Sequence, residues 1–146
     1  MILRLLLTVF GLLLIVAAHD RTDGDIVDLM KLLSASSDDH KLLQELLENE
    51  NLRRSDRLEK LNEILLRQTR EIQEVYDMKM TYEDEVEYMR KQENENRKMT
   101  ASAAERKYME EMAKLKNDMT ITVAEFKEHK KRLQKFFLKD SKKNEN

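Results

Sequence analysis

The chain has 146 residues, no cysteine, proline or tryptophan, only two glycines, and a formal net charge of −2. The missing cysteines exclude disulfide scaffolds and cysteine nucleophiles, and the scarcity of glycine excludes glycine-rich phosphate-binding loops. Because compact folds use glycine and proline in turns, this composition predicts few, long helices. The expected fold class is all-α: long amphipathic helices with coiled-coil heptads, as a helical hairpin or an extended coiled coil, plus a short N-terminal helix.

The first segment, residues 1–18, has the features of a signal peptide. Arg4 precedes an uncharged apolar run at 5–18, which would span about 21 Å as a helix at roughly 1.5 Å per residue, less than the ~30 Å hydrocarbon core. Small residues end the run at Ala18, and polar His19 follows. We therefore expect cleavage after Ala18 and secretion of the mature chain. The alternative is an uncleaved N-terminal membrane anchor.

Residues 19–37 are expected to form a short helix and a capping linker. The stretch 25–33 carries four apolar residues at helical spacing: Ile26, Leu29, Met30 and Leu33. The following Ser/Asp cluster is typical of a helix start, with Ser36 or Ser37 as the candidate N-cap.

A first coiled-coil helix is expected over residues 38–92, because no helix-breaking residue interrupts this stretch. From Leu58 to Met89 its heptad a and d positions are apolar except at Gln68 and Lys79. The predicted first contact seam consists of Leu58, Leu61, Leu65, Ile72, Val75, Tyr82, Val86 and Met89.

A polar break is expected at residues 93–98, because no residue between 90 and 98 is apolar and two asparagines weaken the helix there. A second coiled-coil helix should then cover 99–138, followed by a disordered tail at 139–146. The predicted second contact seam consists of Tyr108, Met112, Leu115, Met119, Phe126, Leu133 and Phe136. The two seams differ in heptad phase, so one continuous straight coiled coil would have to unwind locally between them.

Both seams are narrow, which favours packing of helix against helix over packing on a broad globular core. The partner helix comes either from the same chain, folded back at 93–97, or from an oligomer. Residues 19–63 carry 12 acidic and 7 basic side chains, a net −5, whereas residues 127–146 carry 3 acidic and 8 basic, a net +5. This asymmetry favours antiparallel pairing.

Catalysis is not expected. The only histidines are His19, His40 and His129, and no two of them lie within one helical turn, so the sequence predicts neither a metal site nor a cofactor. The acidic residues between 83 and 87 lack the looped, glycine-containing backbone of calcium sites, which indicates a solvated helix face. We expect no enzyme activity.

The last distinctive feature is a basic segment with interleaved aromatic residues near the C-terminus. Its candidate polyanion contacts are Lys127, Lys130, Lys131, Arg132, Lys135 and Lys139. The sequence supports two functions. The first is a secreted, non-enzymatic coiled-coil protein acting as a structural or protein-interaction module, with itself or another helical protein as partner. The alternative is a helical module that binds anionic lipid surfaces or sulfated polyanions. Nucleic acid is not an expected partner in that compartment.

Overall fold

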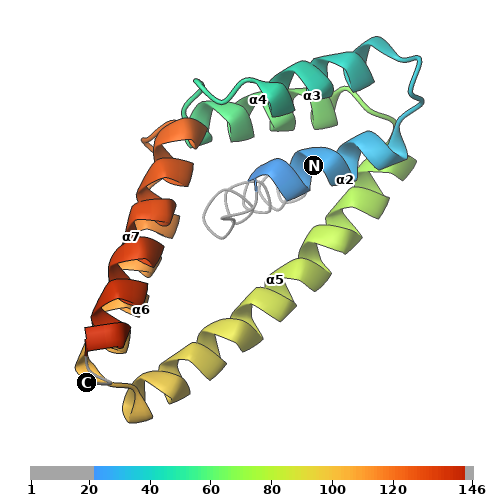
Figure 1. Ribbon diagram of the computed structural model, residues 1–146. Coiled ribbons are helices and arrows are strands. Elements are labelled where there is room, and N and C mark those ends of the chain that lie inside the picture. The colour runs from blue at the N-terminus through green and yellow to red at the C-terminus, as the bar shows by residue number, and fades with distance from the viewer. Residues whose placement is uncertain (1–21, 144–146) are drawn as a thin grey trace. The chain divides into compact units, whose positions relative to one another are not determined.

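The computed structural model describes residues 22–143, and the side chains of residues 22–137. This part of the chain is helical, which confirms the all-α class, and its only β-type pairing is an isolated bridge between Arg53 and Thr122. The described helices (Figure 1) are α2 (Thr22–Leu32), α3 (Asp38–Glu48), α4 (Arg54–Leu66), α5 (Arg70–Thr100), α6 (Ala103–Asn117) and α7 (Val123–Lys143).

The chain forms two compact units. Among the described residues, the first unit comprises 22–48 and Arg57–Val86, which include α2, α3, most of α4 and the first half of α5. The second unit comprises Asn49–Asp56 and the chain from Glu87 onward, which include the start of α4, the rest of α5, and α6 and α7.

The core of the first unit is largely aliphatic. Its buried apolar residues are Ile26, Leu29, Leu43, Leu46, Leu58, Leu61, Ile64, Leu65, Tyr76 and Met80. Helices α2 and α3 pack against each other, and α5 is tied to α2 by an ion pair between Lys79 and Asp28. The expected N-cap is confirmed at Ser37, whose Oγ accepts a hydrogen bond from the His40 amide at 3.1 Å, so α3 begins at Asp38.

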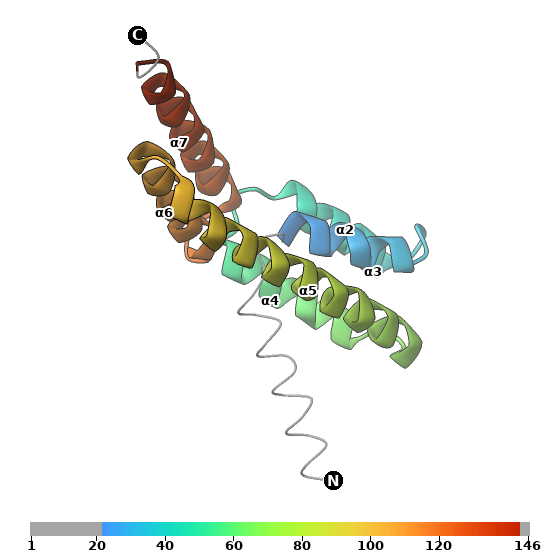
Figure 2. The ribbon, with the colours of Figure 1, turned by 90° about the horizontal axis from the view of Figure 1, so that it is seen from below.

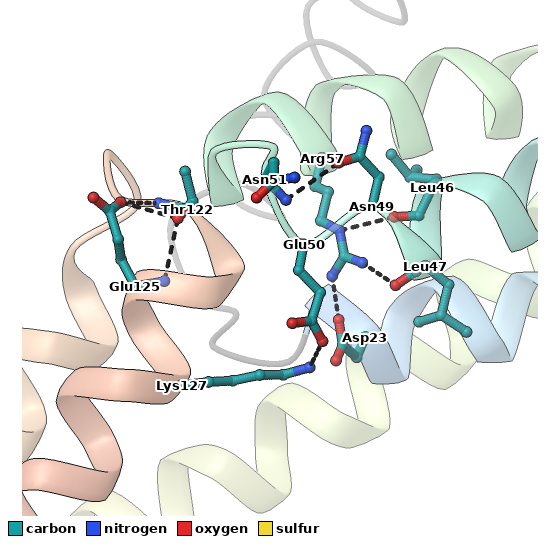
Figure 3. Close-up of polar contacts among 10 residues, drawn as sticks. All are labelled: Asp23, Leu46, Leu47, Asn49, Glu50, Asn51, Arg57, Thr122, Glu125 and Lys127. Carbon is teal, nitrogen blue, oxygen red and sulfur yellow. Dashed lines mark hydrogen bonds and ion pairs between the residues drawn. The ribbon is translucent and has the colours of Figure 1, made fainter.

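The second unit is built on a helical hairpin of α6 and α7, which lie side by side in Figure 2. Leu115 of α6 and Val123 of α7 are buried, and the rings of Tyr108 and Phe137 stack with centroids 4.7 Å apart. Each helix starts with a capping box. Ser102 exchanges hydrogen bonds with Glu105 at the start of α6, and Thr122 does the same with Glu125 at the start of α7 (Figure 3).

The single helix expected over 38–92 is corrected to three helices, with breaks at residues 49–53 and 67–69. At the first break the Asn51 amide donates to the Asn49 side chain at 3.2 Å (Figure 3), a local turn that competes with helical bonding. At the second, Thr69 caps α5, since its Oγ1 accepts a hydrogen bond from the Ile72 amide at 3.5 Å. Polar side chains therefore end these helices without glycine or proline.

The expected break at 93–98 is also corrected, because α5 continues through these residues to Thr100. An ion pair between Lys98 and Glu95, 2.6 Å apart and one helical turn apart in the chain, supports the helix there. The chain turns instead at residues 101–102, just before the Ser102 capping box.

The second helix expected over 99–138 is divided at residues 118–122 into α6 and α7. The cause is again local: the Asp118 carboxylate accepts from the Thr120 amide at 3.0 Å, and Thr122 caps the next helix. Helix α7 ends at Lys143, so residues 139–143 of the expected disordered tail are helical. The expected signal peptide at 1–18 and residues 144–146 lie outside the described residues.

Candidate helix-docking face

The residues of the predicted first seam separate into two groups. Leu58, Leu61 and Leu65 of α4 are buried in the core of the first unit. On α5 no member of the seam is fully buried. Ile72 and Val86 are half-buried. The other three members are exposed: Val75, Tyr82 and Met89. Met89 belongs to the second unit. The seam is thus a core element on α4 and a solvent-facing surface on α5.

The part of α5 in the first unit has two apolar faces. Tyr76 and Met80, four residues apart, are buried in the core. On another face, Val75, Met78 and Tyr82 are 50%, 74% and 64% exposed. Their spacing of three and then four residues aligns them along one side of the helix. We call these three residues the α5 face.

Carboxylates border the α5 face. Glu71 lies one turn before Val75, Glu74 precedes Val75 directly, and Glu85 lies one turn after Tyr82, all exposed. Hydrogen bonds from its own backbone N–H and from the Thr69 side chain hold the pKa of Glu71 below its usual value. Glu74 pairs with Arg70 at 2.7 Å. The face is therefore apolar along its centre and negatively charged along its border.

The second seam mostly serves the α6–α7 hairpin. Leu115 is buried, while Tyr108, Met112, Phe126 and Leu133 are half-buried. Met119 lies in the loop between α6 and α7, and its carbonyl accepts from the Ser55 amide at 2.9 Å. Phe136 is the exception, since it is 66% exposed on α7.

The predicted polyanion contacts are spread around α7. Lys130, Lys131 and Lys135 are exposed. Lys127 forms an ion pair with Glu50 (Figure 3), and Arg132 forms one with Glu128 in the same helix. The side chain of Lys139 lies outside the described residues.

Two buried arginines were not predicted by sequence analysis. Arg54 belongs to the second unit, and its Nη1 donates to the carbonyl oxygens at the end of α6. Arg57 belongs to the first unit, and it donates to the carbonyl oxygens of Leu46 and Leu47 at the end of α3 and to Asp23 of α2 (Figure 3). Each guanidinium supplies the donors that a helix C-terminus lacks.

Across residues 22–143, His, Asp and Glu side chains do not gather in groups of three or more suited to a metal ion. Over the same range, none of the helices combines the length and apolar character needed to cross a membrane.

Comparison of the chain with protein-family models, with curated proteins and with solved structures finds no significant match to any of the three.

Proposed function

We propose that this protein is a secreted, non-enzymatic interaction module that docks a partner helix on the α5 face in coiled-coil fashion. The observation that carries the proposal is the exposure of Val75, Met78 and Tyr82 on one side of α5 while Tyr76 and Met80 are buried on another. A helix that buries one face and exposes a second apolar face presents a surface suited to a further helix.

The residue types of the α5 face fit this role. Tyrosine combines a large apolar ring with a polar hydroxyl and is enriched at protein interfaces, and methionine adapts its shape to a partner. The aligned spacing allows the three side chains to insert between the side chains of one approaching helix.

The non-enzymatic part of the proposal draws support from the use of the buried polar groups. Arg54 and Arg57 are the buried arginines, and each donates to backbone carbonyls of a helix end. Such contacts position helices, so both guanidinium groups have a structural role. Secretion draws its support from the signal-peptide pattern of residues 1–18.

A second candidate function is binding of an anionic lipid surface or a sulfated polyanion by α7. It is favoured by the exposure of Phe136 and of two lysines on the same helix, Lys131 and Lys135. Binding to anionic but not to zwitterionic vesicles, lost in the Lys131→Glu/Lys135→Glu variant, would support it.

Photo-crosslinking tests the docking proposal. A benzophenone amino acid replaces Met78 in one variant and Glu59, an exposed polar position on α4, in a control variant. Each is irradiated as pure protein and in the secreted fraction of cells that make it, and the adducts are mapped by mass spectrometry. We expect position 78 to give adducts that map to one helical segment, in a yield several times that of position 59. Equal yields at the two positions in both samples would overturn the proposal.

A further inference from the structure

The part of α5 in the first unit, residues 70–86, is strongly acidic. Residues 70–86 contain six acidic side chains and two basic ones, a net charge of −4. Both basic side chains already form ion pairs within the unit, Arg70 with Glu74 and Lys79 with Asp28. A helix that docks on the α5 face therefore meets a negative border, and a cationic partner with an apolar side chain suits it best.

The chain itself carries such a helix. Residues 127–137 of α7 contain five basic side chains and one acidic one, a net charge of +4. Lys127 forms an ion pair with Glu50 and Arg132 with Glu128, and the other three basic side chains are exposed lysines, Lys130, Lys131 and Lys135. Within this stretch Phe136 is exposed, with Arg132 one turn before it and His129 two turns before it on the same side of the helix. We call Phe136, Arg132 and His129, with the neighbouring exposed Lys135, the α7 face.

From these two surfaces we infer that the α5 face binds the α7 face of a second copy of this chain. The inference rests on the proposed function and names the partner that the α5 face takes. Pairing residues 70–86 of two copies would bring a net −4 against −4, whereas pairing residues 70–86 with residues 127–137 brings −4 against +4. The contact thus joins two different surfaces, and each copy offers both of them.

The chemistry of the contact follows from its two sides. Phe136 packs between Met78 and Tyr82, where aromatic and thioether groups suit an aromatic ring. The carboxylates of Glu71 and Glu85 lie toward the cations of α7. Because these charges are solvent-exposed, the attraction weakens as salt shortens the Debye length from about 10 Å at 0.1 M to about 3 Å at 1 M.

Sedimentation velocity with charge reversal tests the inference. The purified protein should self-associate with rising concentration at low salt, and should associate less at 1 M salt. The Glu71→Lys/Glu85→Lys variant should weaken association by about tenfold or more, because attraction becomes repulsion at two positions. The Arg132→Glu/Lys135→Glu variant should do the same. Mixing these two variants should restore association with each other to within about threefold of the original.

The matched control is Glu59→Lys/Glu63→Lys, which makes the same charge change on exposed positions of α4 and should leave self-association unchanged. Circular dichroism checks that every variant keeps its helicity. A protein that stays monomeric at all concentrations, or one whose association ignores both reversals, overturns the inference. Adducts from position 78 to a different protein would then still support the proposed function, so the two failures are distinguishable.

Discussion

The guanidinium of Arg54 lies over the ring of Phe126, with its central carbon 4.3 Å from the ring centroid. The Nη1 of the same side chain donates to the carbonyl oxygens of Leu115, Lys116 and Asp118 at 3.3, 3.0 and 2.8 Å. One buried side chain thus closes the end of α6 and covers an aromatic ring in the first turn of α7. The cation–π contact and the charge-assisted hydrogen bonds act on the two helices of the same hairpin.

Replacement of Arg54 by methionine should destabilise the second unit by about 2–3 kcal/mol, because the helix-end carbonyls lose their donor while the apolar volume is kept. The preceding residue provides the control. Arg53 is exposed, so Arg53→Met should change the free energy of unfolding by less than about 0.5 kcal/mol. Urea unfolding followed by circular dichroism compares the two variants. Equal effects would show that the burial of Arg54 has no energetic consequence.

Replacement of Arg57 should destabilise the first unit as much as replacement of Arg54 destabilises the second. Replacement of its partner Asp23 should have a much smaller effect. The side chain of Arg57 is fully buried, whereas that of Asp23 is 47% exposed. We expect Arg57→Met to cost about 2–3 kcal/mol and Asp23→Asn less than about 1 kcal/mol, since asparagine keeps an acceptor oxygen for Arg57 at this half-exposed position. Arg57→Lys should also be destabilising. The Nε, Nη1 and Nη2 atoms of Arg57 donate to three separate acceptors, and one ammonium group cannot reproduce that forked geometry. A larger loss for Asp23→Asn than for Arg57→Met would contradict this account.

The capping boxes of the second unit should make it sensitive to acid. Hydrogen bonds from the backbone N–H groups of Ser102 and Thr122 hold the pKa values of Glu105 and Glu125 below the ordinary 4.5. A folded-state pKa below the unfolded value gives stability that is present above pH 4.5 and is lost as the pH falls through the folded pKa. The thermal midpoint should therefore fall on acidification from pH 6 to about pH 3.

Glu125→Gln isolates this effect, because glutamine keeps an acceptor for the Thr122 amide but does not titrate. We expect its thermal midpoint to fall less than that of the original protein over the same pH range. Parallel curves for the two proteins would show that the capping carboxylate does not contribute to the acid sensitivity.

Hydrophobic spacing predicted part of this architecture. The apolar repeat of α4 places Leu58, Leu61 and Leu65 in the core, as the heptad pattern indicates. On α5 the same pattern selects Val75 and Tyr82, which are exposed, and passes over Tyr76 and Met80, which are buried. Both pairs repeat at helical spacing, and only tertiary packing decides which of them enters the core.

The sequence contains a local signal for the starts of α6 and α7, but none for the two buried arginines. The pattern Ser/Thr-x-x-Glu occurs at Ser102 and at Thr122 and marks both helix starts of the hairpin. The motif at Ser102 locates the turn before α6 more accurately than the polar run at 93–98 does, because the chain turns at residues 101–102. The burial of Arg54 and Arg57 has no such local signature, because arginine is ordinarily exposed and only the folded chain brings helix ends to it.

The hydroxyl of Tyr76 lies 3.5 Å from the Asp25 carbonyl oxygen inside the first unit. Burial, assisted by the negative charges of Asp25, Asp28 and Asp77, raises the pKa of this phenol well above the ordinary 10.0. At high pH the unfolded chain therefore loses the phenolic proton while the folded chain keeps it, so stability falls as the pH rises above 10. Between pH 8 and pH 11 this group alone should remove about 1.4 kcal/mol from the free energy of unfolding.

Tyr76→Phe should abolish that part of the loss and cost no more than about 1 kcal/mol at neutral pH, because the hydrogen bond is long. Tyr88→Phe, at an exposed position of α5, is the control and should keep the full alkaline loss. Urea unfolding of the three proteins at the two pH values measures the difference, and an identical alkaline loss in Tyr76→Phe would refute the proposed burial of the phenol.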